Sequence, residues 1–199
     1  LSVEEAQKRT IDMSENWQEE FDTEMQQQRE RSQTAAKGTF KGGLGGQSQE
    51  HKKYHTATHL MYQALRDVLG SHVVQHGSNI TEERLRFDFS HPEKLTSEQI
   101  KQVEDIVNEQ ILKDLQISYA EYPTEEATGQ FGDRYGDVVK VYSMKDPKSH
   151  PELRPYSFEI CGGPHVQHPH ELIENGKKFK IIKEESSSAG IRRIKAVLR

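Results

Sequence analysis

The chain has 199 residues, with 27 Lys and Arg against 32 Asp and Glu, and a formal charge of −5. Its single Cys excludes an internal disulfide, and therefore a disulfide-stabilised secreted domain, and favours a reducing, cytoplasmic setting. The mean hydropathy is −0.90, and no apolar run approaches the roughly 20 residues of a membrane span. The sequence begins without the basic and apolar stretches of a secretory signal, so we expect a fragment of a longer cytoplasmic protein.

The first 48 residues differ in composition from the rest. Residues 1–36 are predicted to form a long polar helix, because Trp17, Phe21 and Met25 recur every four residues among Glu, Gln and Arg. Residues 37–48 contain five of the fourteen glycines, a composition typical of a flexible linker. We therefore expect a helical connector over 1–36, a Gly-rich linker over 37–48 and a compact domain over 49–199.

The compact domain is predicted to begin with helices. A helix over residues 51–69 is indicated by the apolar spacing of Leu60, Ala64 and Leu65, with Gly70 as its C-cap. A second helix begins with a capping-box pattern at Thr96 and carries an apolar face formed by Ile100, Val103, Ile106, Val107 and Ile111.

Short strands are predicted between and after these helices. They fall at residues 73–75, 84–89, 117–122, 138–142, 156–160, 179–183 and 191–197. Helices followed by such a series favour an α+β domain, with the helices packed on a mostly antiparallel sheet.

Four residues have the spacing of metal ligands. His55 and His59 lie one turn apart on the predicted helix, so both imidazoles can reach one ion. Cys161 and His165 follow about a hundred residues later, separated by Gly-Gly-Pro, and the two glycines let the loop turn both side chains inward. Together they predict a His₃Cys zinc site.

The same residues distinguish this site from two common zinc sites. A zinc protease helix carries Glu directly after the first His, where this chain has Thr56. A zinc finger has closely spaced ligand pairs, whereas these ligands need a formed domain to converge. The zinc therefore either stabilises the core or faces a cleft, where it activates water or orients a substrate.

The segments HTATHL, RLRFDFSH, EICGGPHV and SAGIRRIKAV resemble, in this order, the editing domain of alanyl-tRNA synthetases. The resemblance extends from about residue 48 to the end and includes the stand-alone alanyl-tRNA editing proteins and the second additional domain of threonyl- and alanyl-tRNA synthetases. It implies a zinc-containing deacylase that hydrolyses tRNA(Ala) mischarged with serine or glycine. No ATP-binding or aminoacylating unit is recognisable, so ligase activity would belong to the rest of the parent enzyme.

The resemblance also assigns roles to residues. It places His55, His59, Cys161 and His165 on the zinc ligands, and Gln75, together with His55 and His59, at the catalytic position. Thr58, Gln75, Ser78 and His91 are the candidates for the substrate pocket. Pro164 departs from the commoner Thr, and His168-Pro169-His170 replaces a Thr-Gly stretch, which affects the hydrogen bonding of the pocket rather than the metal.

The charge of the chain is unevenly distributed. Residues 1–36 contain nine acidic and four basic residues, which accounts for the whole formal charge of −5. Near the end of the chain, eight Lys and Arg stand against Glu184 and Glu185, so this segment either binds tRNA phosphates or is a solvated strand face. The predicted phosphate contacts are Lys177, Lys178, Lys180, Lys183, Arg192, Arg193 and Lys195.

Two functions follow from the sequence. The first is zinc-dependent editing at the acceptor end of tRNA(Ala), within a cytoplasmic alanine–tRNA ligase. The alternative is a noncatalytic tRNA-binding module in which the zinc is structural.

Overall fold

The computed structural model describes residues 46–123, 138–150 and 152–199, all within one compact unit, Lys41–Arg199. The expected connector over residues 1–36 and most of the linker over 37–48 lie outside the described residues. The described part combines helices with antiparallel strands, which confirms the predicted α+β class. None of its helices is both long and apolar enough to cross a membrane.

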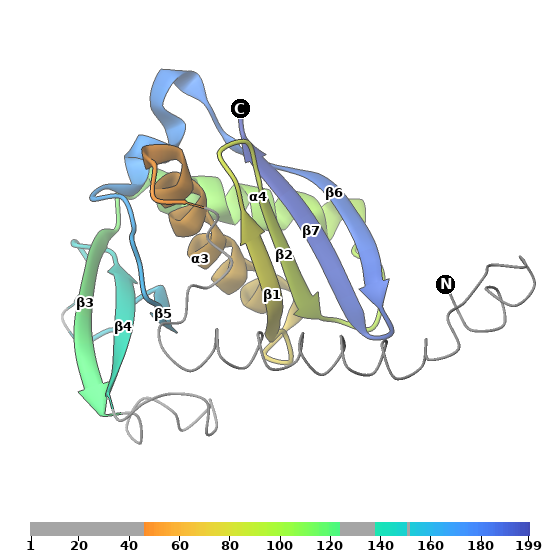
Figure 1. Ribbon diagram of the computed structural model, residues 1–199, viewed down its shortest axis with the longest axis horizontal. Helices are drawn as coiled ribbons and strands as arrows, with labels where there is room; N and C mark the ends of the chain where they lie inside the picture. Colours follow the sequence, from red (N-terminus) through yellow and green to blue (C-terminus); the bar gives the residue numbers. More distant parts are fainter. Residues whose placement is uncertain (1–45, 124–137, 151) are drawn as a thin grey trace, which may run out of the picture. The chain divides into compact units, whose positions relative to one another are not determined.

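Four antiparallel strands form the larger sheet, in the order β1-β2-β7-β6 (Figure 1). The predicted alternation is present in the second strand, because Leu85, Phe87 and Phe89 are fully buried whereas Arg86 is partly exposed. One face of this sheet is therefore apolar and requires a cover. The strands are β1 (Gln75–Ile80), β2 (Leu85–Ser90), β6 (Phe179–Ser188) and β7 (Ile191–Leu198).

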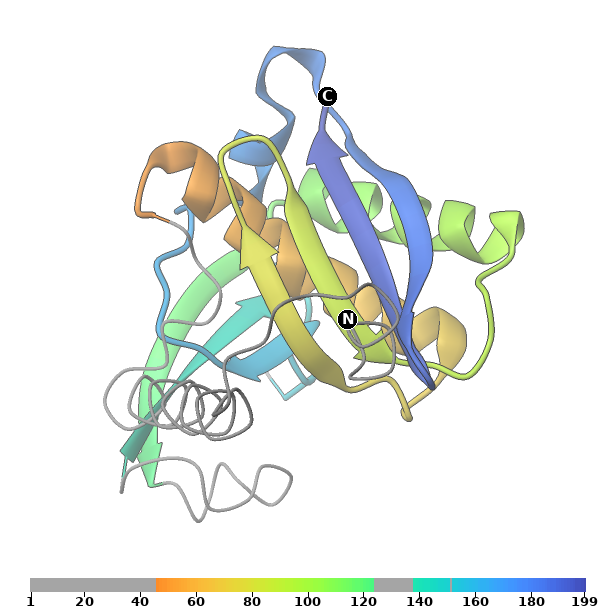
Figure 2. The same cartoon turned by 45° about the vertical axis from the view of Figure 1, so that its right-hand side comes forward.

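Two helices, α3 (Gln49–Leu69) and α4 (Ser97–Leu112), pack on the apolar face of the larger sheet (Figure 2). The predicted apolar faces of both helices are confirmed, because their central side chains form the core with the strands. The fully buried members of these faces are Leu60, Ala64, Leu65, Val103, Val107 and Ile111.

The ends of the helices follow the predicted signals. Gly70 ends α3 as predicted, but with φ 114° and ψ 170° rather than in the left-handed helical conformation expected of such a cap; this φ still strains any residue with a side chain. Thr96 and Gln99 form the predicted capping box of α4, in which each side chain bonds the backbone N–H of the other residue. Further along α4, the buried carboxylate of Glu104 accepts hydrogen bonds from the Ile181 backbone N–H and the Lys180 ammonium, both at 2.7 Å. These bonds hold α4 against β6.

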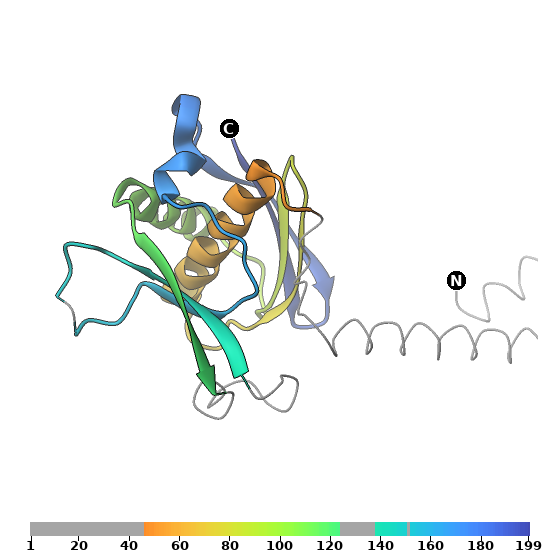
Figure 3. The ribbon, with the colours of Figure 1, turned by 60° about the vertical axis from the view of Figure 1, so that its left-hand side comes forward.

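The remaining strands form a separate sheet in the order β3-β4-β5, so the described strands make two sheets rather than one. Strand β5 contacts α3, and the helix therefore lies between the two sheets (Figure 3). This position buries polar side chains of the helix, including His55 and His59. The strands are β3 (Gln116–Pro123), β4 (Val138–Lys145) and β5 (Ser157–Ile160).

Several elements differ from the predictions. Strand β6 runs over Phe179–Ser188, beyond the predicted 179–183, because it continues to pair with β7. The first strand was predicted at residues 73–75 but runs over Gln75–Ile80, through Gly77-Ser78-Asn79. These residue types have low strand propensity, and the strand exists because it pairs with β2. A 3₁₀ helix, η1 (Pro169–Gly176), was not predicted at all.

The hydroxyl of Tyr54 joins α3 to two other parts of the fold. It donates a hydrogen bond to the Glu83 carbonyl at 2.7 Å and accepts one from the Leu198 N–H at 3.2 Å. Tyr54→Phe leaves both backbone groups unpaired, so we expect the free energy of unfolding in urea to fall by about 1–3 kcal/mol.

Tyr119→Phe is the matched control for this change. Tyr119 is 58% exposed, and its hydroxyl makes no hydrogen bond to the described residues. Its stability should stay within about 0.5 kcal/mol of the parent. Equal losses in the two variants would contradict a role for the Tyr54 hydrogen bonds.

Candidate metal centre

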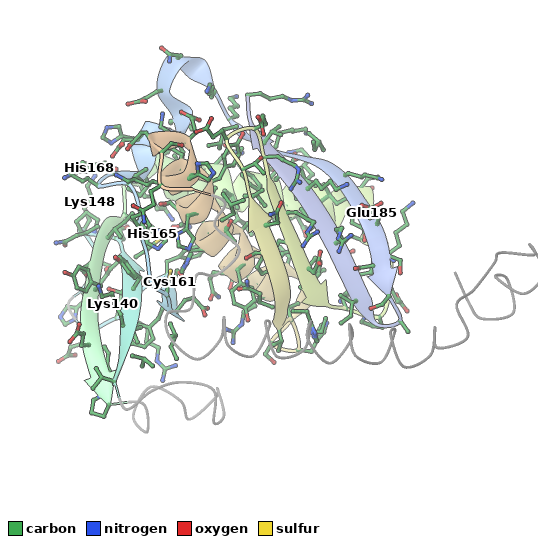
Figure 4. All side chains as sticks on the ribbon, viewed as in Figure 1. Lys140, Lys148, Cys161, His165, His168 and Glu185 are labelled. Atoms are coloured by element: carbon green, nitrogen blue, oxygen red, sulfur yellow. The ribbon has the colours of Figure 1, made fainter. Side chains whose placement is uncertain are left out.

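Four predicted ligands meet where α3 faces the segment after β5. His55 and His59 lie on one face of α3. Cys161 and His165, both labelled in Figure 4, come from the segment that follows β5. The Cys161 sulfur lies 3.2 Å from His55 Nε2 and 3.4 Å from His165 Nε2. One ligand atom from each of the four residues lies within 4.8 Å of the others, so the structure brings the predicted set together.

Hydrogen bonds outside the cluster orient two of the imidazoles. His55 Nδ1 lies 3.0 Å from the Pro164 carbonyl, which can only accept, so Nδ1 carries the hydrogen. His165 Nδ1 lies 3.1 Å from the Thr56 hydroxyl, which already donates to the Lys52 carbonyl at 3.0 Å. Nδ1 of His165 is therefore also the donor, and Nε2 of both rings is left free toward Cys161. Partners of this kind set the tautomer of metal-bound histidines.

The third imidazole, His59, has no such partner in the part of the chain that the structure describes. Its Nδ1 is buried and makes no hydrogen bond to the described residues. Its ring packs edge-on against His55 and His165, with centroid separations of 5.2 and 4.7 Å. A buried nitrogen without a hydrogen-bond partner, beside three other potential metal ligands, is consistent with a site in which a bound ion supplies the missing partner.

Burial sets the protonation states of the four side chains. It lowers the pKa of His55 and of His165, and lowers the pKa of His59 to about 3, so all three imidazoles are neutral at pH 7. Burial also raises the pKa of Cys161 to about 11. Neutral imidazoles are ready to bind a metal, whereas the thiol loses its proton when it does so. Three nitrogens and one sulfur fit zinc well, because zinc prefers four such ligands in a tetrahedron.

The glycine loop packs tightly against a tyrosine on β4. A Cβ at Gly163 would collide with the Tyr142 hydroxyl, and the φ of 67° at Gly163 also favours glycine. The Tyr142 ring in turn packs on His165 at a centroid distance of 4.5 Å. Beside it on β5, burial raises the pKa of Glu159 to about 7. The sequence analysis gave no role to Tyr142, which reaches the site through the pairing of β4 with β5, or to Glu159, which lies two residues before Cys161 in the motif EICGGPHV.

The predicted pocket residues on β1 face the helix side of the sheet. Gln75 is paired with Phe89 and Ser78 with Phe87, and paired residues point to the same face. A bulge between Gln75 and Gly77 puts Gln75 and Ser78 on one face despite their odd spacing. No hydrogen bond within the described part of the chain links either side chain to the four metal-ligand candidates.

The other two pocket candidates have partners elsewhere. The Thr58 hydroxyl donates to the Tyr54 carbonyl at 2.8 Å, so only its lone pairs are available to a ligand. The His91 ring stacks on His72, with Nδ1 of His91 2.9 Å from Nε2 of His72. The structure therefore does not bring His91 into contact with the metal-ligand candidates through any interaction seen among the described residues.

Most of the predicted phosphate-binding side chains are already paired with carboxylates. Lys180 pairs with Glu104, Lys183 and Lys195 with Glu185, Arg192 with Glu184, and Arg193 with Asp88. The Arg193–Asp88 pair is bidentate, with both bonds at 2.7 Å. Lys177 and Lys178 make no ion pair with the residues that the structure describes. The basic segment is thus largely neutralised within the fold.

Comparisons with known proteins give a consistent result. Residues 139–195 match the family model described as the threonyl and alanyl tRNA synthetase second additional domain. The chain is 49% identical over 185 residues to the alanine–tRNA ligase of Treponema denticola, covering 90% of the chain and 29% of that relative. It is 50% identical over 173 residues to the alanine–tRNA ligase of Borreliella burgdorferi, which covers 83% of the chain and 27% of that relative. It is 47% identical over 150 residues to the alanine–tRNA ligase of Bacillus subtilis, which covers 73% of the chain and 16% of that relative. The chain spans less than a third of the length of these curated relatives.

Thr56 provides a test of the metal centre. Its hydroxyl also accepts the Val166 N–H at 3.3 Å, so it holds the His165 segment in two places. Thr56→Val removes this support, and we expect zinc affinity, measured by competition with a chelator, to fall about 10–100-fold.

Thr58→Val is the matched control, because Thr58 is another buried threonine of α3 that bonds back to its own helix. It contacts neither His165 nor Val166 through its hydroxyl, and its zinc affinity should equal that of the parent. Equal affinities in both variants would show that Thr56 does not support the ligand.

Proposed function

Because the chain is homologous to part of the alanine–tRNA ligases over most of its length, we propose that residues 49–199 are the editing domain of such an enzyme. The domain hydrolyses the ester of tRNA(Ala) mischarged with serine or glycine, in the cytoplasm. Residues 1–36 and 37–48 connect it to the remainder of the parent enzyme. The observation that supports this proposal best is the convergence of His55, His59, Cys161 and His165 within a sequence of this family.

A second hydrolytic site answers a physical limit of amino-acid selection. A pocket for alanine cannot strongly reject serine, which adds only one hydroxyl to a side chain of similar size. An editing pocket needs polar groups that bind this hydroxyl. Gln75 and Ser78 face the α3 side of the sheet, and the lone pairs of the Thr58 hydroxyl remain free to accept a hydrogen bond from the serine hydroxyl.

Zinc, when bound, would supply a Lewis acid and a fixed positive charge. His55, His59, Cys161 and His165 hold it, while Pro164 and Thr56 orient two of the imidazoles. Gln75 is our candidate for a polar contact to the substrate. The acceptor end of the tRNA is the partner, and Lys177 and Lys178 are the cations best suited to its phosphates, because the other five predicted contacts already have carboxylate partners.

The donor set also favours a second candidate function. Four protein ligands complete a tetrahedral zinc shell, which is typical of structural sites, whereas catalytic sites keep an open position. The domain would then be a noncatalytic tRNA-binding module in which zinc joins α3 to the segment after β5.

Deacylation of matched substrates separates the two functions. With the zinc-loaded chain and tRNA(Ala) carrying Ser, Gly or Ala, we expect the Ser and Gly esters to be hydrolysed faster than the Ala ester. Cys161→Ala should lower the rate on Ser-tRNA by about tenfold or more, since it removes a direct ligand. His150→Gln, which changes an exposed histidine outside the metal centre, should leave the rate unchanged.

Intact tRNA binding without hydrolysis of any ester by the zinc-loaded parent chain would reject editing and support the noncatalytic module. Hydrolysis of all three esters at one rate would reject the proposed specificity of the pocket.

A further inference from the structure

A second cluster of potential ligands lies where the end of α4 meets the start of η1. Asp114 follows α4 and has φ 50°, which turns the chain sharply at this point. His168 precedes η1 and His170 is in its first turn, on either side of Pro169. Figure 4 labels His168 on the chain segment that continues from Cys161 and His165.

The two imidazoles meet the same carboxylate. His168 Nδ1 lies 3.3 Å from one Asp114 oxygen, and His170 Nδ1 lies 3.0 Å from the other. The His170 backbone N–H also donates to Asp114, at 3.3 Å, and the two rings stack with centroids 5.3 Å apart. One ligand atom from each residue lies within 4.8 Å of the others. The cluster is thus held in place by the backbone as well as by its side chains.

The spacing of these atoms suits a metal ion. Zinc binds nitrogen and oxygen ligands at about 2.0–2.2 Å. Two such ligands on one ion lie about 3.0–3.5 Å apart, which follows from these bond lengths at angles between octahedral and tetrahedral. The separations of 3.0 and 3.3 Å between the nitrogens and the carboxylate oxygens agree with this range. Two imidazoles and a carboxylate favour zinc, nickel or copper over magnesium or calcium.

The surroundings favour a cation. Glu171 lies in the same turn, and its carboxylate accepts the His168 backbone N–H at 2.9 Å. Glu174 is close enough to His170 for their charges to interact. To bind a metal through Nδ1, each imidazole must carry its hydrogen on Nε2 instead. The side chains of His168 and His170 are 59% and 55% exposed, so water can accept a hydrogen bond from Nε2.

We propose that Asp114, His168 and His170 form a second, independent site for a divalent transition-metal ion of the zinc type, with water in the remaining coordination positions. This site is more exposed than the His₃Cys cluster and has fewer protein ligands, so it binds the ion more weakly. A bound ion links the end of α4 to the segment that carries Cys161 and His165. The site does not depend on the proposed editing function.

Calorimetric titration of the metal-free chain with Zn²⁺ tests the proposal. We expect two binding phases, with one ion in each. Asp114→Asn should remove the weaker phase or reduce its affinity by about tenfold or more, and His170→Gln should do the same. Asn tolerates positive φ, so the first variant retains the turn and should fold normally, as checked by circular dichroism.

Two further variants make the result specific. His150→Gln is the matched control, because His150 is 68% exposed and lies 4.0 Å from Glu152 but has no third potential ligand among the residues that the structure describes. It should keep both phases. Cys161→Ala should lose only the tighter phase, which separates this site from the His₃Cys cluster. A parent chain that binds one ion, or an Asp114→Asn variant that binds as much zinc as the parent, would overturn the proposal and leave Asp114 as a hydrogen-bond acceptor only.

Discussion

The burial of α3 between two sheets is the constraint on which the rest of the domain depends. Its apolar side completes the main core, while its other side places His55, Thr56 and His59 out of water, where unpaired polar groups destabilise the fold. The structure satisfies most of them locally, through the Lys52 and Pro164 carbonyls. The ring nitrogens that remain unpaired lie in the His₃Cys cluster, where a bound metal ion would pair them. The packing of α3 against the segment after β5 therefore both buries these nitrogens and gathers the four metal ligands.

The sequence predicted what depends on local periodicity. A one-turn spacing places His55 beside His59, and alternation identifies the buried face of β2, because both follow from the geometry of a single element. The bulge in β1 and the role of Thr56 could not be predicted, since each is decided by a partner far along the chain. The convergence of Cys161 with His55 was predictable only because the chain has a single cysteine and the segment around it has ligand spacing.

The charged residues near the end of the chain could also be predicted only in part from the sequence. Counting residues predicted a basic segment at the end of the chain, but pairing across the sheet assigns a carboxylate to most of its cations. The pairs of Lys183 and Lys195 with Glu185 are exposed enough for phosphates to compete for their cations at modest cost, whereas Arg192–Glu184 and Arg193–Asp88 are largely buried and cost more to break. An RNA partner would therefore exchange existing ion pairs rather than meet a uniformly positive surface, and its affinity would depend strongly on salt.

The distance along the chain between the metal ligands has a consequence for folding kinetics. His55 and Cys161 are 106 positions apart, so their approach requires closure of a long loop, which the packing of the core must first offset. We expect the four side chains to converge after the rate-limiting step, because α3 and the segment after β5 meet only once the core that positions them has packed. Interactions that are absent from the folding transition state slow unfolding without accelerating folding. An ion in the His₃Cys cluster would thus prolong the lifetime of the folded domain and leave the time needed to reach it unchanged.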